Sequence, residues 1–324
     1  MVMVSQELFN EAIRLEDDGQ PQQALAVWRE LAISSATRNV FIRLGGCAKD
    51  LGLTDEAESA FKSALEIDDR SALALVMLGS LAMHSGHYEA AEGYLKSACA
   101  VEESASSFTL LGVALDSLGK TLEAEEAYRR AIRLDSDYEE AYYNLGVLLR
   151  DDRPAEAQAL FGKALDLDPQ YALAHRELGW VLYGRGAHDQ ETEDHLRKAV
   201  ELEPDDSWSH LYLGSYLWGN DVESSVAEFE AARKLQPTWT APLWSLGNIH
   251  EFVLEDFDSA QAFFEQALRL DPEDTVTLTN FGRLCKKRGQ LDLAKGYLGR
   301  ALLLDPEYKK ARALLDDIAS ESAV

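Results

Sequence analysis

The sequence has 324 residues, with 31 lysines and arginines against 57 aspartates and glutamates, so its formal net charge is −26. A surface this acidic repels phosphate groups, which argues against nucleic acid as a partner. Hydrophobic residues make up 46% of the chain, enough to bury a substantial core, so the acidity belongs to a folded surface rather than to a disordered tail.

The chain also lacks the marks of export. Its start, MVMVSQELFNEAIRLEDDG, has neither the basic region nor the continuous apolar run of a signal peptide, and the most apolar run, ALALVMLGSLAM at 72–83, is too short to span a bilayer. Cys47, Cys99 and Cys285 lie far apart and outside any C-x-x-C pair. We therefore expect a cytoplasmic protein with reduced, buried thiols and no membrane insertion.

One pattern repeats along the chain at intervals of 33 to 35 residues. Its marker is a glycine that follows a leucine or, once, a phenylalanine: Gly45, Gly79, Gly112, Gly146, Gly179, Gly214, Gly247 and Gly282. About sixteen residues later comes a large apolar side chain, three residues before an alanine: Phe61, Leu95, Tyr128, Phe161, Leu196, Phe229, Phe264 and Leu298. A degenerate first copy precedes these, with Ala12, Gly19, Ala24 and Trp28 at the corresponding places.

Each copy contains two stretches with apolar residues at i, i+3, i+4 and i+7, separated by a turn with Gly, Asp or Asn. This spacing predicts a pair of amphipathic helices. The repeated glycines and alanines predict close contacts between helices, where a larger side chain would overpack the contact by about 1–3 kcal/mol. In the last five repeats a proline, such as Pro169 or Pro306, ends one helix and suits the first turn of the next.

This pattern resembles the tetratricopeptide repeat (TPR) family, whose unit is a helix-turn-helix of 34 residues. The resemblance implies an all-α, right-handed superhelical solenoid with a C-terminal capping helix. It places nine tandem repeats in residues 5–308, at about 5–37, 38–71, 72–105, 106–138, 139–171, 172–206, 207–239, 240–274 and 275–308. Residues 309–320 form the predicted capping helix and 321–324 a tail.

The turn inside the helix pair varies in length. It is one residue short in LLRDDRPAEA and YLWGNDVESS and one residue long in LYGRGAHDQET and HEFVLEDFDSA. We expect these changes to shift the local curvature and to leave the fold intact.

Nine repeats and a cap leave no insertion long enough for a catalytic domain, so we predict that the chain is not an enzyme and has no catalytic residues and no cofactor. The stretch RLGGCAKDLG at 43–52 superficially resembles a glycine-rich phosphate loop, yet no strand precedes it, and Gly45 and Gly52 are the repeat's packing and turn glycines. His188, Glu191 and His195 share one helix face, as metal ligands would, but a third strong ligand is missing, so we predict no metal site.

In the family that the sequence resembles, the first helices of the repeats line a concave groove that binds extended peptides or partner helices. Repeats over about 139–255 place aromatic and polar side chains at or beside these positions: Tyr143, Asn144, Arg150, Arg176, Trp180, Tyr183, Trp208, Tyr212, Trp218, Trp244, Asn248 and Phe252. An aromatic side chain there either packs against the neighbouring repeat or is offered to a partner, and the sequence leaves both open.

Further upstream the same face is apolar, with Leu73, Val76, Met77 and Met83. These side chains could accept a partner's helix or could be covered by self-association.

The segment RLCKKRG is the one strongly basic stretch, and it makes Arg283, Lys286, Lys287 and Arg288 a candidate docking patch for an acidic peptide; a solvated charged face is the alternative. Some relatives in the family clamp the terminal carboxylate of heat-shock chaperones. Here Asn248, Asn280 and Lys310 match three of those positions, but Trp244 and Leu314 stand where a Lys and an Arg are needed, so we do not predict such a receptor.

Taken together, these features favour a non-enzymatic scaffold or adaptor that binds a protein or peptide in its groove. Two alternatives remain. The chain could be a chaperone or inhibitor that sequesters a single basic or apolar client, or the regulatory subunit of a separately encoded enzyme.

Overall fold

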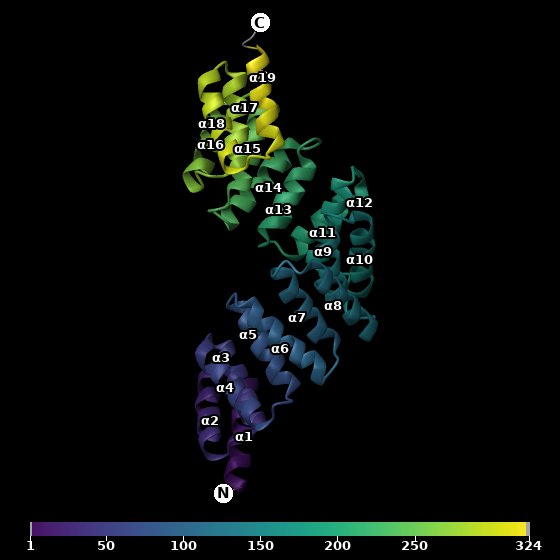
Figure 1. The fold of residues 1–324 in the computed structure, drawn as a ribbon, viewed down its shortest axis with the longest axis vertical. Coiled ribbons are helices and arrows are strands. Elements are labelled where there is room, and N and C mark those ends of the chain that lie inside the picture. The colour runs from purple at the N-terminus through teal and green to yellow at the C-terminus, as the bar shows by residue number, and fades with distance from the viewer. Residues whose placement is uncertain (1, 322–324) are drawn as a thin grey trace. The chain divides into compact units, whose positions relative to one another are not determined.

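The computed structural model describes residues 2–321, which places Ser322, Ala323 and Val324 of the predicted tail outside the described residues. Within the described range every regular element is an α-helix. The chain divides into two compact units, Met1–Pro169 and Gln170–Val324. We call them the N-unit and the C-unit and describe each by itself. Figure 1 shows each unit as a stack of paired helices.

The N-unit contains five helix pairs. Its helices are α1 (Val2–Asp17), α2 (Pro21–Ser34), α3 (Arg38–Asp50), α4 (Thr54–Ile67), α5 (Ala72–His84), α6 (Tyr88–Val101), α7 (Ala105–Ser117), α8 (Thr121–Leu134), α9 (Glu139–Leu149) and α10 (Pro154–Leu167).

The C-unit contains four helix pairs and a last single helix. Its helices are α11 (Ala172–Gly184), α12 (Gln190–Leu202), α13 (Ser207–Leu217), α14 (Val222–Leu235), α15 (Thr240–Phe252), α16 (Phe257–Leu270), α17 (Thr275–Lys287), α18 (Leu291–Leu304) and α19 (Lys309–Glu321).

The helices of each unit form two layers. Consecutive helices pack as pairs, such as α3 with α4 and α13 with α14, and the second helix of a pair also contacts the first helix of the next pair in the same unit. First helices contact one another directly, as α5 and α7 do in the N-unit and α11 and α13 do in the C-unit. The predicted all-α TPR-type solenoid of helix pairs is therefore confirmed, and α19 covers α17 and α18 at the end of the C-unit.

The repeated glycine makes room for a large side chain from the second helix of its own pair. A Cβ atom built on Gly45 would lie 2.6 Å from the ring of Phe61, which is fully buried. The same relation joins each of the other seven glycines to its partner: Gly79 to Leu95, Gly112 to Tyr128, Gly146 to Phe161, Gly179 to Leu196, Gly214 to Phe229, Gly247 to Phe264 and Gly282 to Leu298. The structure thus confirms the packing role that the spacing predicted.

The turn inside the pair absorbs the length differences seen in the sequence. In the regular repeats a glycine in the left-handed region ends the first helix: Gly52 has φ of +74°, and the Leu53 amide donates to the Ala48 carbonyl at 2.8 Å. Where the turn is one residue short, the first helix ends early, so α9 and α13 have 11 residues instead of 13. The long turn after α15 instead places Glu255 at φ of 51°.

The three cysteines are buried thiols. Burial raises the pKa of the Cys47 thiol and of the Cys99 thiol to about 11, so both remain protonated at neutral pH. No helix in the described part of the chain is long and apolar enough to cross a membrane, and the apolar run ALALVMLGSLAM lies within α5.

Candidate functional site

Two first helices of the C-unit are joined by an aromatic stack. Trp180 on α11 and Tyr212 on α13 have ring centroids 4.1 Å apart and ring planes 12° apart. Trp180 follows the repeat glycine Gly179 directly, and Tyr212 lies two residues before the next one. Both side chains therefore project from the face on which α11 and α13 meet, and Tyr212 is left only 5% exposed.

The stack continues towards solvent through two more tryptophans. Trp208, near the start of α13, meets the edge of Tyr212 at 5.7 Å and packs on Trp239 at 4.5 Å. Trp208 is 44% exposed. We call Trp180, Tyr212, Trp208 and Trp239 the aromatic cluster. It is a connected set of rings, buried at Tyr212 and open to solvent at Trp208.

Trp239 was missed by the sequence analysis. It lies at the N-cap of α15, before the first helical residue of its repeat, and the turn before α15 brings it against Trp208. A signal was present in the sequence, because Trp239 is one of six tryptophans and follows a proline two residues earlier, but its neighbour could not be read from spacing.

Three other predicted aromatics of the C-unit, Tyr183, Trp218 and Trp244, pack in the same core as the cluster. Tyr183 donates a hydrogen bond from its hydroxyl to the Ser215 carbonyl at 3.2 Å and meets Tyr216 edge-on at 5.9 Å. Trp218 and Trp244 are half-buried against the same core. These residues combine a packing role with partial exposure. Packing within the unit is therefore observed for this face, and contact with a partner stays a prediction.

Arg176 fixes the approach of α11 to α13. Its guanidinium pairs with Glu177 at 2.9 Å and with Asp206 at 2.8 Å, and Asp206 also caps α13 by accepting from the Ser209 amide at 3.0 Å. Burial opposes ionisation of Asp206, but the hydrogen bonds from Ser209 and Arg176 outweigh it and hold the pKa of this carboxyl below its ordinary value. Arg176 thus connects α11 and α13, which carry three of the four rings of the aromatic cluster.

A second polar network lies further along the C-unit. Arg283 on α17 binds both oxygens of Glu251 on α15, at 3.2 and 3.0 Å, although Glu251 is completely buried. The same guanidinium donates to the side-chain oxygens of Asn248 and Asn280 at 2.7 and 2.9 Å. It also lies 4.5 Å from the ring centroid of Phe252, which is 51% exposed. The side-chain oxygens of Asn248 and Asn280 therefore already accept hydrogen bonds within this network. The Phe252 ring has the Arg283 guanidinium on one face and is half-exposed to solvent.

The remaining cations of the predicted basic patch also have partners in the chain. Lys286 pairs with Asp317 on α19. Lys287 donates to the Glu251 carbonyl at 3.3 Å and lies 4.8 Å from the ring centroid of Phe257, and Arg288 pairs with Asp258 at 2.9 Å. Docking of an acidic peptide on this patch stays a prediction.

Three predicted groove residues belong to the N-unit, on or next to α9. The Asn144 side chain donates to the Glu140 carbonyl at 2.8 Å, and the Tyr143 ring lies 6.0 Å from that of Phe161. Arg150 is half-buried and lies 3.6 Å from the Asp151 carboxylate.

His188 and His195, predicted to share one helix face, contact other aromatic side chains. His195 lies 2.8 Å from His175, nitrogen to nitrogen, and His188 packs edge-on against Tyr183 at 5.2 Å. Burial, with help from His175, lowers the pKa of His195. Among the described residues no cluster of three or more potential ligand side chains could hold a metal ion.

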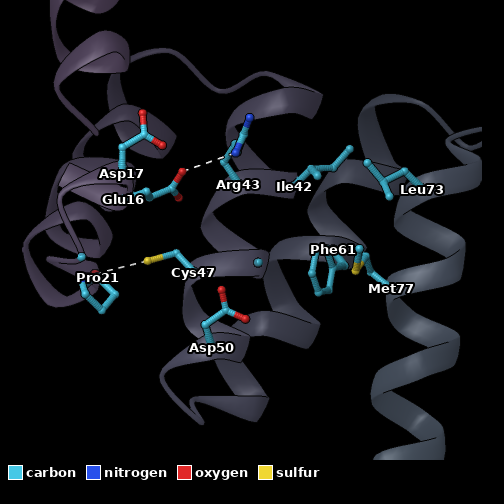
Figure 2. A pocket seen from close by; sticks show the side chains of 12 residues that line it. Glu16, Asp17, Pro21, Ile42, Arg43, Cys47, Asp50, Phe61, Leu73 and Met77 are labelled. Carbon is cyan, nitrogen blue, oxygen red and sulfur yellow. Dashed lines mark hydrogen bonds and ion pairs between the residues drawn. The ribbon is translucent and has the colours of Figure 1, made fainter. Parts of the chain in front are cut away.

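A pocket lies in the N-unit, where the sequence predicted an apolar surface but no pocket. It has a volume of about 650 Å³ and is lined by residues of α1, α3 and α5, together with Gly19 and Pro21 around the start of α2 and Phe61 of α4 (Figure 2). Leu73 and Met77 of the upstream apolar face are part of its wall. The sequence carries one sign of this pocket, a second glycine, Gly46, directly after the packing glycine Gly45. That Gly46 faces open space is seen only in the structure.

Comparison with known proteins identifies the family. The middle TPR-like domain of cilia and flagella-associated protein 70 matches residues 10–133, and tetratricopeptide repeat models match residues 147–207 and 254–320. The chain is a tetratricopeptide repeat protein. TPR solenoids generally mediate contacts between proteins.

The matches to individual proteins have low sequence identity or cover only part of the chain. Over 180 residues the TPR chain is 32% identical to the human protein O-mannosyl-transferase TMTC2, a match that covers 55% of this chain and 21% of that protein. A chain of the APC/C hetero-tetramer Cut9–Hcn1 is similar in structure, with a TM-score of 0.64 and 18% identity. The match covers 93% of this chain and 59% of that chain. The human IFIT1 dimer with m7Gppp-AAAA has a TM-score of 0.58 at 17% identity and covers 92% and 81%. At these identities the two structures share the fold alone.

Proposed function

We propose that this TPR protein is a non-enzymatic, cytoplasmic scaffold or adaptor that holds a peptide or helix of a partner protein on the first-helix face of the C-unit. The observation that carries the proposal is the aromatic cluster, in which Trp208 is 44% exposed while resting on Tyr212 and Trp239. A tryptophan that is already fixed loses little freedom on binding, and tryptophan, tyrosine and arginine carry most of the energy at protein interfaces.

A second apolar surface on the C-unit supports a polypeptide as the ligand. Phe252 is exposed over the guanidinium of Arg283, and the next two residues, Val253 and Leu254, are exposed as well. These three exposed side chains form a second apolar surface on the C-unit. Separate apolar anchors with polar groups around them suit a chain of amino acids better than a single small molecule.

A second candidate function, the sequestering of a basic client, is favoured by one specific feature. The chain carries a net charge of −26, and three of the residues that line the N-unit pocket are carboxylates, Glu16, Asp17 and Asp50. A surface of this sign attracts a basic partner and weakens its hold as salt is added. A sequestering protein would silence one client, whereas a scaffold would leave its partner active.

A photo-crosslinking amino acid tests the proposal in the source cells. We expect p-benzoylphenylalanine at position 208 to crosslink to a discrete partner protein. The matched control is position 303 on α18, because Leu303 is 83% exposed and lies outside the aromatic cluster. Crosslinks of the same pattern at both positions, or none at 208, would sink the assignment of the binding face.

A further inference from the structure

The pocket of the N-unit has a floor without a side chain. Gly46 on α3 is one of its lining residues, and a Cβ atom built there would meet no atom within 4 Å. The wall on the α5 side is apolar, formed by Leu73 and Met77, and Leu73 is 49% exposed. In Figure 2 these two side chains face α3 across the opening. The pocket therefore offers an apolar surface that solvent and a ligand can both reach.

The opposite side of the pocket is acidic. Glu16 is held in place, since one of its oxygens accepts from the Trp28 indole at 2.8 Å and the other pairs with Arg43 at 3.4 Å. Asp17 and Asp50 are exposed, and neither forms an ion pair among the described residues. Three carboxylates against the single cation of Arg43 give the pocket a net negative charge. In Figure 2, Cys47 lies between Asp17 and Asp50.

The thiol of Cys47 adds no charge to this surface. Its sulfur donates to the Pro21 carbonyl at 3.2 Å. Burial first, and the nearby Glu16 and Asp50 next, raise the pKa of this thiol to about 11. The thiol is therefore a neutral part of the floor and a poor nucleophile.

The two exposed carboxylates stand where helix geometry disfavours them. Asp17 is the last residue of α1 and Asp50 is the last residue of α3. The C-terminus of a helix carries partial negative charge, so an acidic side chain there lowers helix stability. Asp17 in the first repeat and Asp50 in the second stand at corresponding positions, so both repeats carry this destabilising acid. Both acids line the same pocket. A local penalty of this kind is expected where a residue serves binding.

We propose that this pocket binds a basic segment of a partner protein, which pairs a lysine or arginine side chain with Asp17 and Asp50 and places an apolar neighbour against Leu73 and Met77. Carboxylates form charge-assisted hydrogen bonds with both cations, and the aliphatic stems of those cations pack on apolar walls. An acidic segment is repelled from the same surface. The proposal adds a second site to the proposed function and rests on it only in taking the ligand to be a polypeptide.

Selection from a random dodecapeptide phage library tests the pocket without assuming a partner. The full chain is the bait, and peptides that also bind the Gly46→Leu variant are removed. Leucine favours helix more than glycine does and would occupy the empty floor, so this variant blocks the pocket while keeping the fold; its melting temperature and helical content verify that. We expect enriched peptides with a lysine or arginine beside an apolar residue. Peptides without a cation, or no peptide that Gly46→Leu rejects, overturn the proposal.

The charge is tested on one enriched peptide by fluorescence anisotropy. The double variant Asp17→Asn with Asp50→Asn should bind at least tenfold more weakly than the wild type. Its control, Glu58→Gln with Glu66→Gln, makes the same change in net charge on the outer helix α4 and should change the affinity less than twofold. Equal losses in the two double variants would mean attraction by overall charge and would overturn the site.

The variant Trp208→Ala separates the two sites. If the pocket and the aromatic cluster act independently, this variant binds the selected peptide as tightly as the wild type but loses the partner found by crosslinking at position 208. Loss of the peptide with Trp208→Ala would overturn the assignment to the pocket. If Trp208→Ala binds the crosslinked partner as tightly as the wild type does, that result counts against the proposed function.

Sedimentation tests a second copy of this chain as the occupant of the pocket. If the wild type forms dimers that Gly46→Leu abolishes, the occupant is a second copy, and the proposal of a basic segment is overturned.

Discussion

The pocket of the N-unit and the aromatic cluster of the C-unit occupy the same register positions of the repeat. Among the positions that differ between them, three decide whether the space is open or filled. The residue after a repeat glycine is Gly46 or Trp180, the second residue before the next repeat glycine is Met77 or Tyr212, and the sixth residue before it is Leu73 or Trp208. In the N-unit these side chains leave a pocket of about 650 Å³. In the C-unit they stack, with Trp180 and Tyr212 4.1 Å apart.

The difference teaches that the repeat and its surface are specified separately. The backbone pairing is set by the glycine that accepts Phe61 in one case and Leu196 in the other. The neighbouring positions are free of that constraint, so they can hold no side chain at all or a tryptophan. Function can therefore change along the array without any change of fold.

The largest expected effect compares the two units at the second residue before the repeat glycine. Tyr212→Ala removes a nearly buried ring from the aromatic stack, and we expect a loss of about 3 kcal/mol in the free energy of unfolding of the C-unit. Met77→Ala removes a half-buried side chain beside an open pocket and should cost about 1 kcal/mol in the N-unit. Urea titrations followed by circular dichroism measure both, and equal losses would break the comparison.

Two adjacent glycines of α3 should respond in opposite directions. The Cβ of Gly45→Ala would lie 2.6 Å from Phe61, so we expect a destabilisation of about 2 kcal/mol. The Cβ of Gly46→Ala enters open space and should stabilise the helix by about 1 kcal/mol. The same urea titrations report the sign, and a destabilising Gly46→Ala would show that the pocket is filled in solution.

A pH effect is expected at His210 in the C-unit. Its ring nitrogens lie 2.6 Å from the Glu228 carboxylate and 2.9 Å from the Pro204 carbonyl, and the hydrogen bond with Glu228 raises the pKa of His210 above its ordinary value. Because the folded-state pKa is raised, this stabilisation is full below pH of about 6.5 and is lost as pH rises through the folded-state pKa.

The measurement compares wild type with His210→Gln. We expect the stability difference between them to shrink by about 1 kcal/mol when the urea titrations are moved from pH 5.5 to pH 9. A difference that grows with pH would contradict the role of the charged imidazole.

The smallest effect concerns the fifth residue after the repeat glycine, which is Asp50 at the end of α3 and Lys287 at the end of α17. An acid is disfavoured and a base favoured at a helix C-terminus. Asp50→Asn should therefore raise the free energy of unfolding by about 0.5 kcal/mol, and Lys287→Gln should lower it by a similar amount. Melting temperatures report the sign of both changes. Both changes should weaken in 1 M salt; shifts of the same sign in the two variants would refute the dipole argument.

Much of the fold could be predicted because its rules are local in the repeat. The repeat spacing predicted which helices pair and that the repeated glycines lie at close contacts between helices, and the structure confirms both. That Phe61 and its counterparts fill the space at these glycines is seen only in the structure. The division of the chain after Pro169 was not predicted, because the repeat pattern continues unbroken through that point.

The candidate site could be predicted only in part. Register on the first helix was enough to select Trp180, Tyr212 and Trp208 as one surface. Contacts between neighbouring repeats were beyond it, as the burial of Glu251 beneath Arg283 shows, since the strength of such a pair depends on distances that spacing does not give. The pocket was missed because nothing in the sequence distinguishes Gly46 from the packing glycine Gly45. Only the structure shows that Gly46 faces open space.

The central claim is that the exposed end of the aromatic cluster binds a partner protein. The direct measurement is isothermal titration of the partner crosslinked at position 208, once purified, against wild type, Trp208→Ala and Leu303→Ala. Trp208→Ala should weaken binding by about 2 kcal/mol or more, as expected for a tryptophan at the centre of an interface, while Leu303→Ala binds as the wild type. Equal affinity for all three proteins would contradict the account.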